Sequence, residues 1–280
     1  MRKCLLALVA LLVVVPSHGQ DFPTFAEKAI AEPPFDRAIW AIRVEEDDGT
    51  PVYSRNAHTL MLPASNRKLF AASTVANCLG WDARLQTELW LDGEDLVLRG
   101  GGDPSLGGRY YDSPALALDP FIRAVRGRGL RTIRDVVADV SLFDRVTIPG
   151  SWKVGNLPYK YAAPVDSLTY AENVNGEAAV VEPGLFAAQS LRDALSFAGI
   201  TVTGTVRLCA ASCNASGLAE RLAAIRSPYV SQLLSTVLEN SQNLYTETLL
   251  KDLSMPRNGP LMTPPPPAAG SPEATTPLSA

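Results

Sequence analysis

Histidine is nearly absent from this sequence, whose 280 residues include only His18 and His58. With so few imidazoles, the chain offers almost no histidine that could act as a general base. The cysteines and histidines also show no metal-ligand spacing, which excludes a structural zinc site. We therefore expect neither a metal nor another cofactor, and any base must come from a different residue type.

The chain also lacks a basic surplus and a long apolar run. Its formal net charge is −4, and losing the two cations of residues 1–19 would leave about −6. A nucleic-acid partner usually requires clustered Lys and Arg, so this balance argues against nucleic acid. The apolar stretch from Leu5 to Val15 is shorter than the roughly 20 residues of a spanning helix, so we expect no integral membrane span.

The N-terminus has the pattern of a secretory signal peptide. Arg2 and Lys3 precede the apolar stretch, and Pro16 to Gly19 lie near a plausible cleavage point. Cys4 lies before the stretch rather than at its end, which argues against a lipoprotein anchor. The sequence thus predicts that residues 1–19 direct export to the periplasm.

Export permits disulfide bonds. Cys209 and Cys213 could pair across a turn that Ser212 and Asn214 favour, or they could remain free thiols. Cys78 lies in an apolar helical run, where we expect it to be packed rather than reactive.

Residues 20–83 and 219–254 have mixed helical and strand patterns, and we expect them to form one domain. The predicted elements are a helix at 22–31, strands at 38–44 and 52–54, a helix from about 63 to 79, and helices near 229–238 and 244–253. In the predicted helix from about 63 to 79, helical spacing is kept by apolar residues that predict a buried face, namely Leu69, Ala72, Val75, Ala76 and Leu79.

Residues 84–218 have a different pattern, with short strands, turns and one or two helices. The predicted elements are a hairpin at 85–91 and 95–98, strands at 131–142, 178–181 and 201–208, and a helix at 185–198. We interpret this stretch as an inserted, strand-rich region. From residue 255 to 280 the chain is rich in Pro, Ala and Ser, which predicts a disordered tail.

Ser65-Asn66-Arg67-Lys68 stands at the head of the helical run ending near Leu79. A hydroxyl and an amine three positions apart share one helix face, so the lysine could take a proton from the serine. This requires burial or a neighbouring cation to lower the pKa of Lys68. The alternative interpretation is an N-cap serine beside a solvated lysine.

Ser241-Gln242-Asn243 lies between two helical segments and could bring a second hydroxyl and an amide to that lysine. The same Ser-x-Asn spacing occurs at 54–56 and 212–214, but only Ser241 sits where another helix end could meet it. The alternative interpretation is a plain helix–helix turn.

Taken together, these motifs resemble the class C low-molecular-mass penicillin-binding proteins, the D-alanyl-D-alanine carboxypeptidase/endopeptidase family (peptidase family S13). The resemblance spans roughly residues 22 to 253 and follows the family's order: Leu62–Lys68, Gly100–Leu106, Tyr161–Pro164, Glu172-Asn173, Glu182–Gly184 and Ser241–Leu244.

The resemblance implies an α+β fold: a partial serine beta-lactamase or penicillin-binding-protein-like transpeptidase fold with an inserted strand-rich region and its late sheet strands missing. It also implies acyl transfer on the D-Ala-D-Ala peptide stems of peptidoglycan, with beta-lactams as acylating inhibitors. Ser65 would attack, Lys68 would act as base, and Ser241 would relay the proton to the leaving amine. Asn243 would hold the substrate peptide.

One motif of the family, Lys-Thr-Gly on a late strand, is absent. The lysines after residue 68 are Lys153, Lys160 and Lys251, and none precedes Thr-Gly. The missing strand would bind the substrate carboxylate and supply an oxyanion-hole amide, whose loss typically costs about 10²–10³ in rate. We therefore expect a truncated member with impaired activity.

Two other functions remain open. One is a non-catalytic module that binds peptidoglycan or a protein partner through the inserted region. The other is a serine beta-lactamase, which shares Ser-x-x-Lys but would carry a mostly helical stretch between its motifs.

Overall fold

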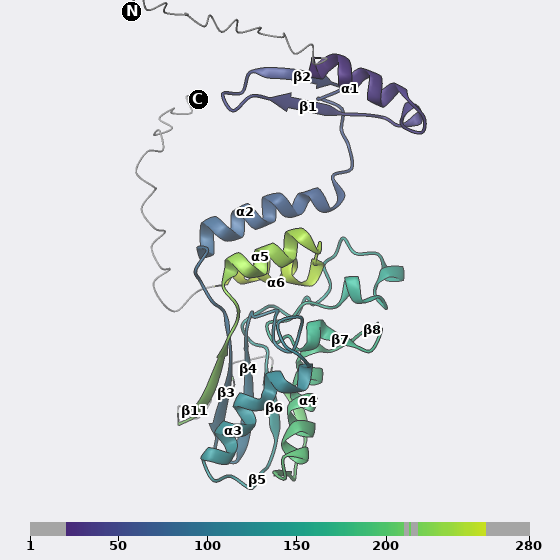
Figure 1. Cartoon of the computed structure of the whole chain (residues 1–280). Coiled ribbons are helices and arrows are strands. Elements are labelled where there is room, and N and C mark those ends of the chain that lie inside the picture. Colours follow the sequence, from purple (N-terminus) through teal and green to yellow (C-terminus); the bar gives the residue numbers. More distant parts are fainter. Residues whose placement is uncertain (1–20, 210–212, 214–217, 256–280) are drawn as a thin grey trace, which may run out of the picture. The chain divides into compact units, whose positions relative to one another are not determined.

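A computed structural model describes residues 21–209, 213 and 218–255, which fall into two compact units divided between Pro63 and Ala64 (Figure 1). The expected signal peptide and nearly all of the expected tail lie outside these residues. Within the described ranges, no helix has the length and apolar character to cross a membrane. The same residues contain no cluster of His, Cys, Asp and Glu suited to a metal.

The first unit is a helix with a two-stranded ribbon. It contains α1 (Phe22–Ala31) and the antiparallel strands β1 (Ile42–Glu45) and β2 (Pro51–Arg55), which confirms the predicted helix and the pairing of two strands, although the first strand begins at Ile42 rather than at residue 38. The connecting turn has Gly49 at φ +85°, and Thr50 N donates to the Asp48 carboxylate at 2.8 Å. Glu27 ties α1 to β2 by accepting a 2.7 Å hydrogen bond from the hydroxyl of Tyr53.

The second unit contains a mixed five-stranded sheet in the order β10-β6-β4-β3-β11. Its strands are β3 (Gln86–Asp92), β4 (Asp95–Gly101), β6 (Val136–Asp139), β10 (Val206–Cys209) and β11 (Glu220–Arg226). The predicted hairpin is confirmed as β3 and β4, which pair antiparallel from Gln86↔Gly101 to Asp92↔Asp95. The strands β4, β6 and β10 run parallel.

Several strand predictions are altered in the structure. The strand expected at 131–142 is divided into β5 (Thr132–Ile133) and β6, and the intervening Arg134 instead forms an ion pair with Asp95. The strands expected at 178–181 and 201–208 are also shorter. They appear as β8 (Ala178–Ala179), which pairs with β7 (Val174–Asn175), and as β9 (Thr201–Val202) and β10. Cys209 at the end of β10 forms a disulfide with Cys213.

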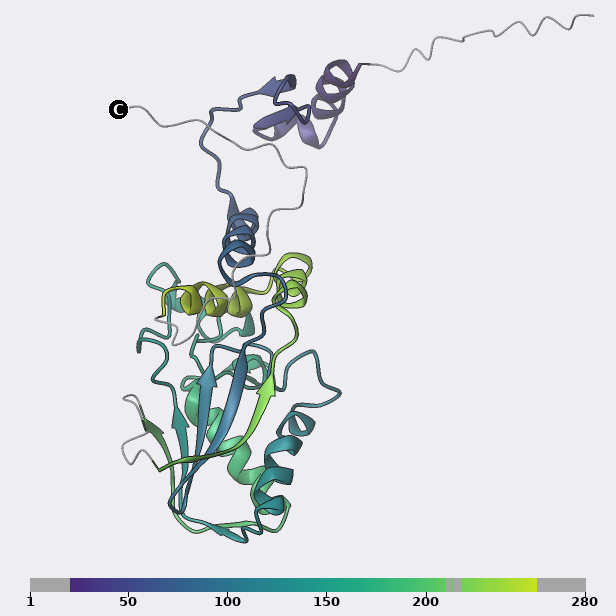
Figure 2. The same ribbon diagram turned by 90° about the vertical axis from the view of Figure 1, so that its left-hand side faces the viewer.

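Helices α3 (Asp119–Gly127) and α4 (Pro183–Phe197) cover one face of this sheet (Figure 2). The core between them buries Leu89 and Leu98 of the sheet, Phe121 of α3 and Leu191 of α4. The α4 helix begins two residues before the predicted start, since proline is well suited to the first helical position. The α3 helix was not predicted.

A second core lies among α2 (Arg67–Leu79), α5 (Val230–Glu239) and α6 (Asn243–Leu253), all three predicted as helices. Its buried side chains include Val75, Leu233 and Tyr245. The expectation that Leu69 is buried with them is wrong, because 57% of its surface is exposed.

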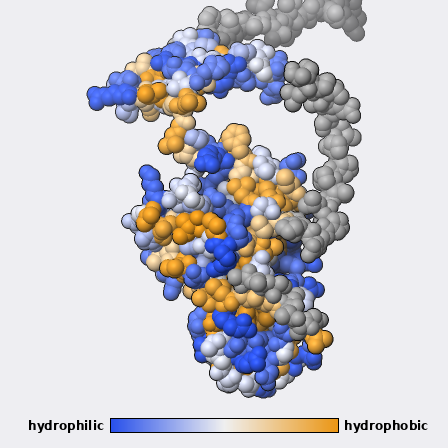
Figure 3. Space-filling view, turned by 180° about the vertical axis from the view of Figure 1, so that it is seen from behind, coloured by the Kyte–Doolittle hydropathy of each residue, from blue (hydrophilic) through white to orange (hydrophobic). Residues whose placement is uncertain are grey.

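Within the described residues of this unit, α5 and α6 cover one side of α2. Leu69 lines an open groove of about 600 Å³ with Trp81 and Leu238. Cys78, expected to be packed, is exposed. Apolar surface is visible on this unit in Figure 3, and the exposed apolar side chains also include Phe70.

The two cores draw on different parts of the chain. The sheet core takes its buried residues from 89–225, and the helical core takes them from 72–85 and 230–249. Strand β11 lies beyond residue 218, where the inserted region was expected to end, and yet it pairs with β3. The division into residues 20–83 with 219–254 and an insertion at 84–218 stays a prediction.

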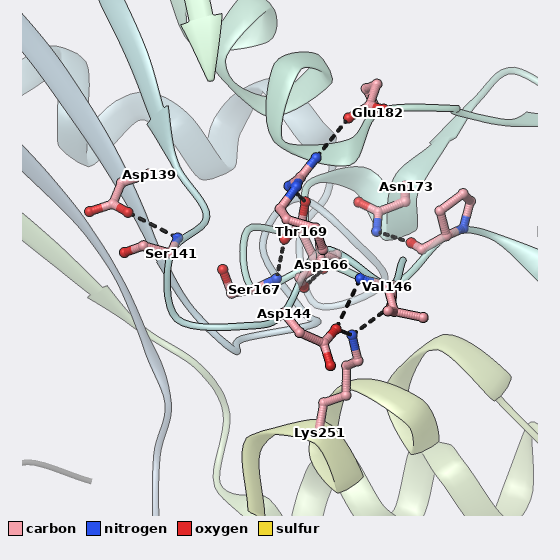
Figure 4. A network of polar contacts seen from close by, with 12 residues as sticks. Asp139, Ser141, Asp144, Val146, Asp166, Ser167, Thr169, Asn173, Glu182 and Lys251 are labelled. Carbon is pink, nitrogen blue, oxygen red and sulfur yellow. Dashed lines mark hydrogen bonds and ion pairs between the residues drawn. The ribbon is translucent and has the colours of Figure 1, made fainter. Parts of the chain in front are cut away.

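Polar contacts join α6 to the loop that follows β6 (Figure 4). Lys251 donates to the Asp144 carboxylate at 2.5 Å and to the carbonyl of Val146 at 2.6 Å. Behind this loop, Asp166 is buried and accepts from Ser167 N at 2.8 Å. Burial raises the pKa of Asp166 to about 6.

Candidate active site

Ser65 lies on a short 3₁₀ turn, Ala64–Asn66, directly before α2. Its side chain is on an exposed residue, whereas Lys68 on the first turn of α2 is only 8% exposed. The Nζ of Lys68 lies 3.3 Å from the Oγ of Ser65. The interpretation of this lysine as a solvated residue beside a capping serine is therefore wrong.

Lys68 also contacts the loop between α5 and α6. Its Nζ donates to the Oγ of Ser241 at 3.0 Å and to the Oδ1 of Asn243 at 2.6 Å. The hydroxyl of Ser241 in turn donates to the Oγ of Ser65 at 2.9 Å. The structure thus brings together all four side chains that the sequence singled out, from positions up to 178 residues apart.

The environment of Lys68 favours loss of its proton. Burial lowers the pKa of Lys68 below the ordinary 10.5, and the nearby carboxylate of Glu247 opposes this shift. A free amine at this position could accept a proton from either neighbouring hydroxyl. The arrangement has the elements of a serine nucleophile with an adjacent base.

Asn243 is fixed at both ends of its side chain. Its oxygen accepts from Lys68, and its Nδ2 donates to the backbone carbonyl of Tyr161 at 2.8 Å. Asn243 is the first residue of α6, and the side chain of Gln242 caps that helix by accepting from Leu244 N at 3.1 Å. The amide of Asn243 therefore links the lysine to the region around Tyr161, on the other side of the site.

An open groove of about 630 Å³ begins at these residues. Ser241 and Asn243 are part of its lining, and Arg109, Lys160 and Glu172 add charged groups to it. A groove of this size and polarity could hold an extended peptide beside Ser241.

Some residues around the site were missed in the sequence. The sequence motif that contains Glu172 predicts no role for it, yet its carboxylate accepts from Gln242 Nε2 at 3.0 Å and pairs with Arg109 at 2.9 Å. Both partners are distant in sequence, so no local spacing identifies them. The available signal was the position of Gln242 inside the Ser241 motif.

The motif Gly100–Leu106 has a packing role in the structure. A side chain at Gly100 would place its Cβ 2.4 Å from the backbone of Ser167 and Leu168. The carboxyl of Asp103 is fully buried, and burial raises its pKa to about 6. This motif holds the loop of Ser167 against the end of β4.

Comparison with known proteins identifies one family for most of the chain. The family described as D-Ala-D-Ala carboxypeptidase 3 (S13) matches residues 25–177 and 170–264. A D-alanyl-D-alanine carboxypeptidase of Actinomadura sp. (strain R39) is 34% identical over 148 residues, which are 50% of this chain and 26% of that protein. Carboxypeptidase DacB of Mycolicibacterium smegmatis is 25% identical over 75% of this chain and 47% of its own length.

The fold is also similar to a solved structure. Penicillin binding protein 4 (dacB) from Haemophilus influenzae superposes with a TM-score of 0.63 at 18% identity, covering 74% of this chain and 60% of that one. The predicted α+β, penicillin-binding-protein-like fold is confirmed. The chain spans between a quarter and a half of the length of the two relatives described above.

Proposed function

Since this chain belongs to the D-Ala-D-Ala carboxypeptidase 3 (S13) family, we propose that it cleaves the D-Ala-D-Ala peptides of peptidoglycan by acyl transfer to Ser65. One observation carries the proposal: the Nζ of Lys68 lies within hydrogen-bond distance of the hydroxyls of both Ser65 and Ser241. A serine becomes a competent nucleophile when an adjacent base takes its proton.

In the proposed reaction, the free amine of Lys68 takes the hydroxyl proton as the Oγ of Ser65 bonds to the carbonyl carbon of the penultimate D-alanine. The hydroxyl of Ser241, 3.0 Å from the amine and 2.9 Å from the nucleophile, passes its proton to the leaving nitrogen and takes one from the protonated Lys68, which becomes a free amine again. The C–N bond breaks and an ester on Ser65 remains. Water then hydrolyses this ester and restores the serine.

Asn243 and the adjacent groove would hold the peptide stem. The reaction is carboxypeptidase cleavage when the leaving group is a free D-alanine, and endopeptidase cleavage when it is a cross-linked peptide. Beta-lactams would acylate Ser65 by the same attack. We place the reaction in the periplasm, to which the predicted signal peptide of residues 1–19 would direct the chain.

We also propose that the 280-residue chain acylates slowly, because its sequence contains no Lys-Thr-Gly. One lost oxyanion-hole donor corresponds to about 10²–10³ in rate. Labelling experiments with this chain therefore need long incubations and high reagent concentrations.

A fluorescent penicillin tests the proposal. The wild-type chain should acquire a covalent label, and Ser65→Ala should not. Ser73→Ala is a matched control, because Ser73 lies on the same helix with an exposed side chain, and it should label like the wild type. Labelling that persists in Ser65→Ala would contradict the assignment of the nucleophile.

The same experiment distinguishes the two other functions. A folded chain that acquires no label supports a non-catalytic module that binds peptidoglycan or a protein partner. Rapid release of the label supports a beta-lactamase.

A further inference from the structure

The backbone of Ser241 adopts a conformation that L-residues rarely take. Its φ is +54°, in the left-handed region, and it lies at the middle of the three-residue connection between Glu239, the last residue of α5, and Asn243, the first residue of α6. Such a conformation persists only where the surroundings hold it. The hydroxyl of Ser241 reaches both Lys68 and Ser65 from this conformation.

One ion pair holds both neighbours of Ser241 in the chain. The Nη1 of Arg109 donates to the Oδ1 of Asn240 at 2.7 Å, and the Oε2 of Glu172 accepts from the Nε2 of Gln242 at 3.0 Å. Arg109 and Glu172 join each other through two hydrogen bonds, of 2.9 and 3.4 Å. The residues before and after Ser241 are thus connected through a single charged pair.

Glu172 is itself held in an unusual backbone. Ala171, Glu172 and Asn173 have φ values of +49°, +55° and +56°, three consecutive left-handed residues. The buried side chain of Asn173 fixes this turn by accepting from Tyr170 N and donating to the carbonyl of Pro164 at 2.8 Å. The carboxylate of Glu172 therefore extends from a rigid support.

We propose that Arg109 and Glu172 are positioning residues for Ser241, holding its hydroxyl where it can relay a proton between Lys68 and the leaving group. This inference rests on the proposed function. The carboxylate form of Glu172 is required, because it accepts hydrogen bonds from Arg109, Gln242 and the hydroxyl of Tyr245. A glutamine at position 172 would bring an NH₂ group against one of these donors.

The test is the rate of acylation by a fluorescent penicillin, measured over a range of reagent concentrations. The dependence of the rate on reagent concentration gives the maximal acylation rate constant and the dissociation constant of the initial complex separately. Glu172→Gln should lower the rate constant by about 10- to 100-fold, because small misplacements of a reacting group have effects of this size. The dissociation constant should change less than twofold.

Arg109→Lys is a second variant with the same expected result, because a lysine keeps the charge but loses the fork that joins Asn240 to Glu172. The side chain of Arg109 is 34% exposed, so we expect the substitution not to disturb folding. Glu239→Gln is the matched control and should behave as the wild type. Glu239 is an exposed residue near the same loop, and within the described residues it accepts a hydrogen bond from Ser235 at 3.0 Å.

The outcomes separate the two proposals. A wild-type chain that labels while both variants keep its rate constant overturns the positioning role and leaves the proposed function intact. A higher dissociation constant at an unchanged rate constant also overturns the positioning role, since the pair would then act in binding. A wild-type chain that is folded but never labels overturns the proposed function, and the positioning role with it.

Discussion

The buried carboxyl of Asp103 should make the stability of this chain depend on pH in an unusual direction. Its Oδ1 accepts from the backbone N–H and the hydroxyl of Ser105 at 2.8 and 2.6 Å, and its Oδ2 has no hydrogen-bond partner within the described part of the chain. Burial raises the pKa from the ordinary 3.8 to about 6. The folded state therefore keeps a proton that the unfolded state releases.

The sign and size of the effect follow from this difference. Between about pH 4 and pH 6 the unfolded carboxyl is ionised while the folded one resists ionisation, so the free energy of unfolding falls as pH rises. The two pKa values correspond to about 3 kcal/mol for this one group. Asp103→Asn cannot ionise and should lack this part of the pH dependence.

The measurement is urea-induced unfolding of the wild type and Asp103→Asn at pH values from 4 to 7. The difference in unfolding free energy, wild type minus variant, should fall by about 2 kcal/mol over this range, because the rest of the effect lies below pH 4. A change in unfolding free energy that the substitution causes equally at every pH does not alter the slope of this difference. The pH-dependent contribution of Asp166 is present in both proteins and cancels. A difference that stays constant from pH 4 to pH 7 would refute the reasoning.

Asp135→Asn is a control with the opposite sign. A backbone hydrogen bond from Thr205, followed by Arg207, lowers the pKa of Asp135. Its contribution to stability is present above the ordinary carboxyl pKa and is lost as pH falls. The difference between the wild type and this variant should therefore rise with pH only below about pH 4, so this control is measured by extending the series to lower pH.

Three further predictions concern the site and its support. Acylation by penicillin should speed up with pH to a midpoint below 10.5, because burial lowers the pKa of Lys68; a rate independent of pH would contradict its role as base. Ser241→Ala should slow acylation by about 10²–10⁴-fold through loss of the proton relay, and a rate within tenfold of the wild type would exclude that relay. Gly100→Ala should destabilise the chain by about 1–3 kcal/mol in thermal unfolding, since its Cβ would overlap a neighbouring backbone. Gly127→Ala in α3 meets nothing within 4 Å and should be neutral or stabilising; equal melting temperatures for the two variants would contradict the packing argument.

The sequence predicts a helix or a strand best where the pattern of apolar residues continues over many residues. The helices α2, α4, α5 and α6 and the β3–β4 hairpin all follow from it. The α3 helix has helical spacing at Phe121, Ile122 and Val125, but its nine residues are shorter than the window in which such spacing is decisive. The exposure of Leu69 shows a different limit: periodicity identifies the apolar face of a helix but not how much of that face a neighbour covers.

The sequence predicts the local contacts of the candidate site but not the contacts between segments that are distant in sequence. Ser65 and Lys68 are one helical turn apart, so their contact follows from local geometry. The approach of Ser241 depends on how α5 and α6 pack, and it was accessible only through the resemblance to a family. Arg109 and Glu172 meet across 63 positions through a left-handed turn that no spacing rule anticipates.

Helix α6 contacts the candidate site at one end and the loop of Asp144 at the other. Asn243 at its first residue contacts Lys68, and Lys251, about 12 Å farther along the axis, holds the loop at Asp144. Because the same helix makes both contacts, we expect a displacement of its far end to alter the contact with Lys68. Any substitution that releases the far end should therefore also be examined for a change in the reactivity of the lysine at position 68.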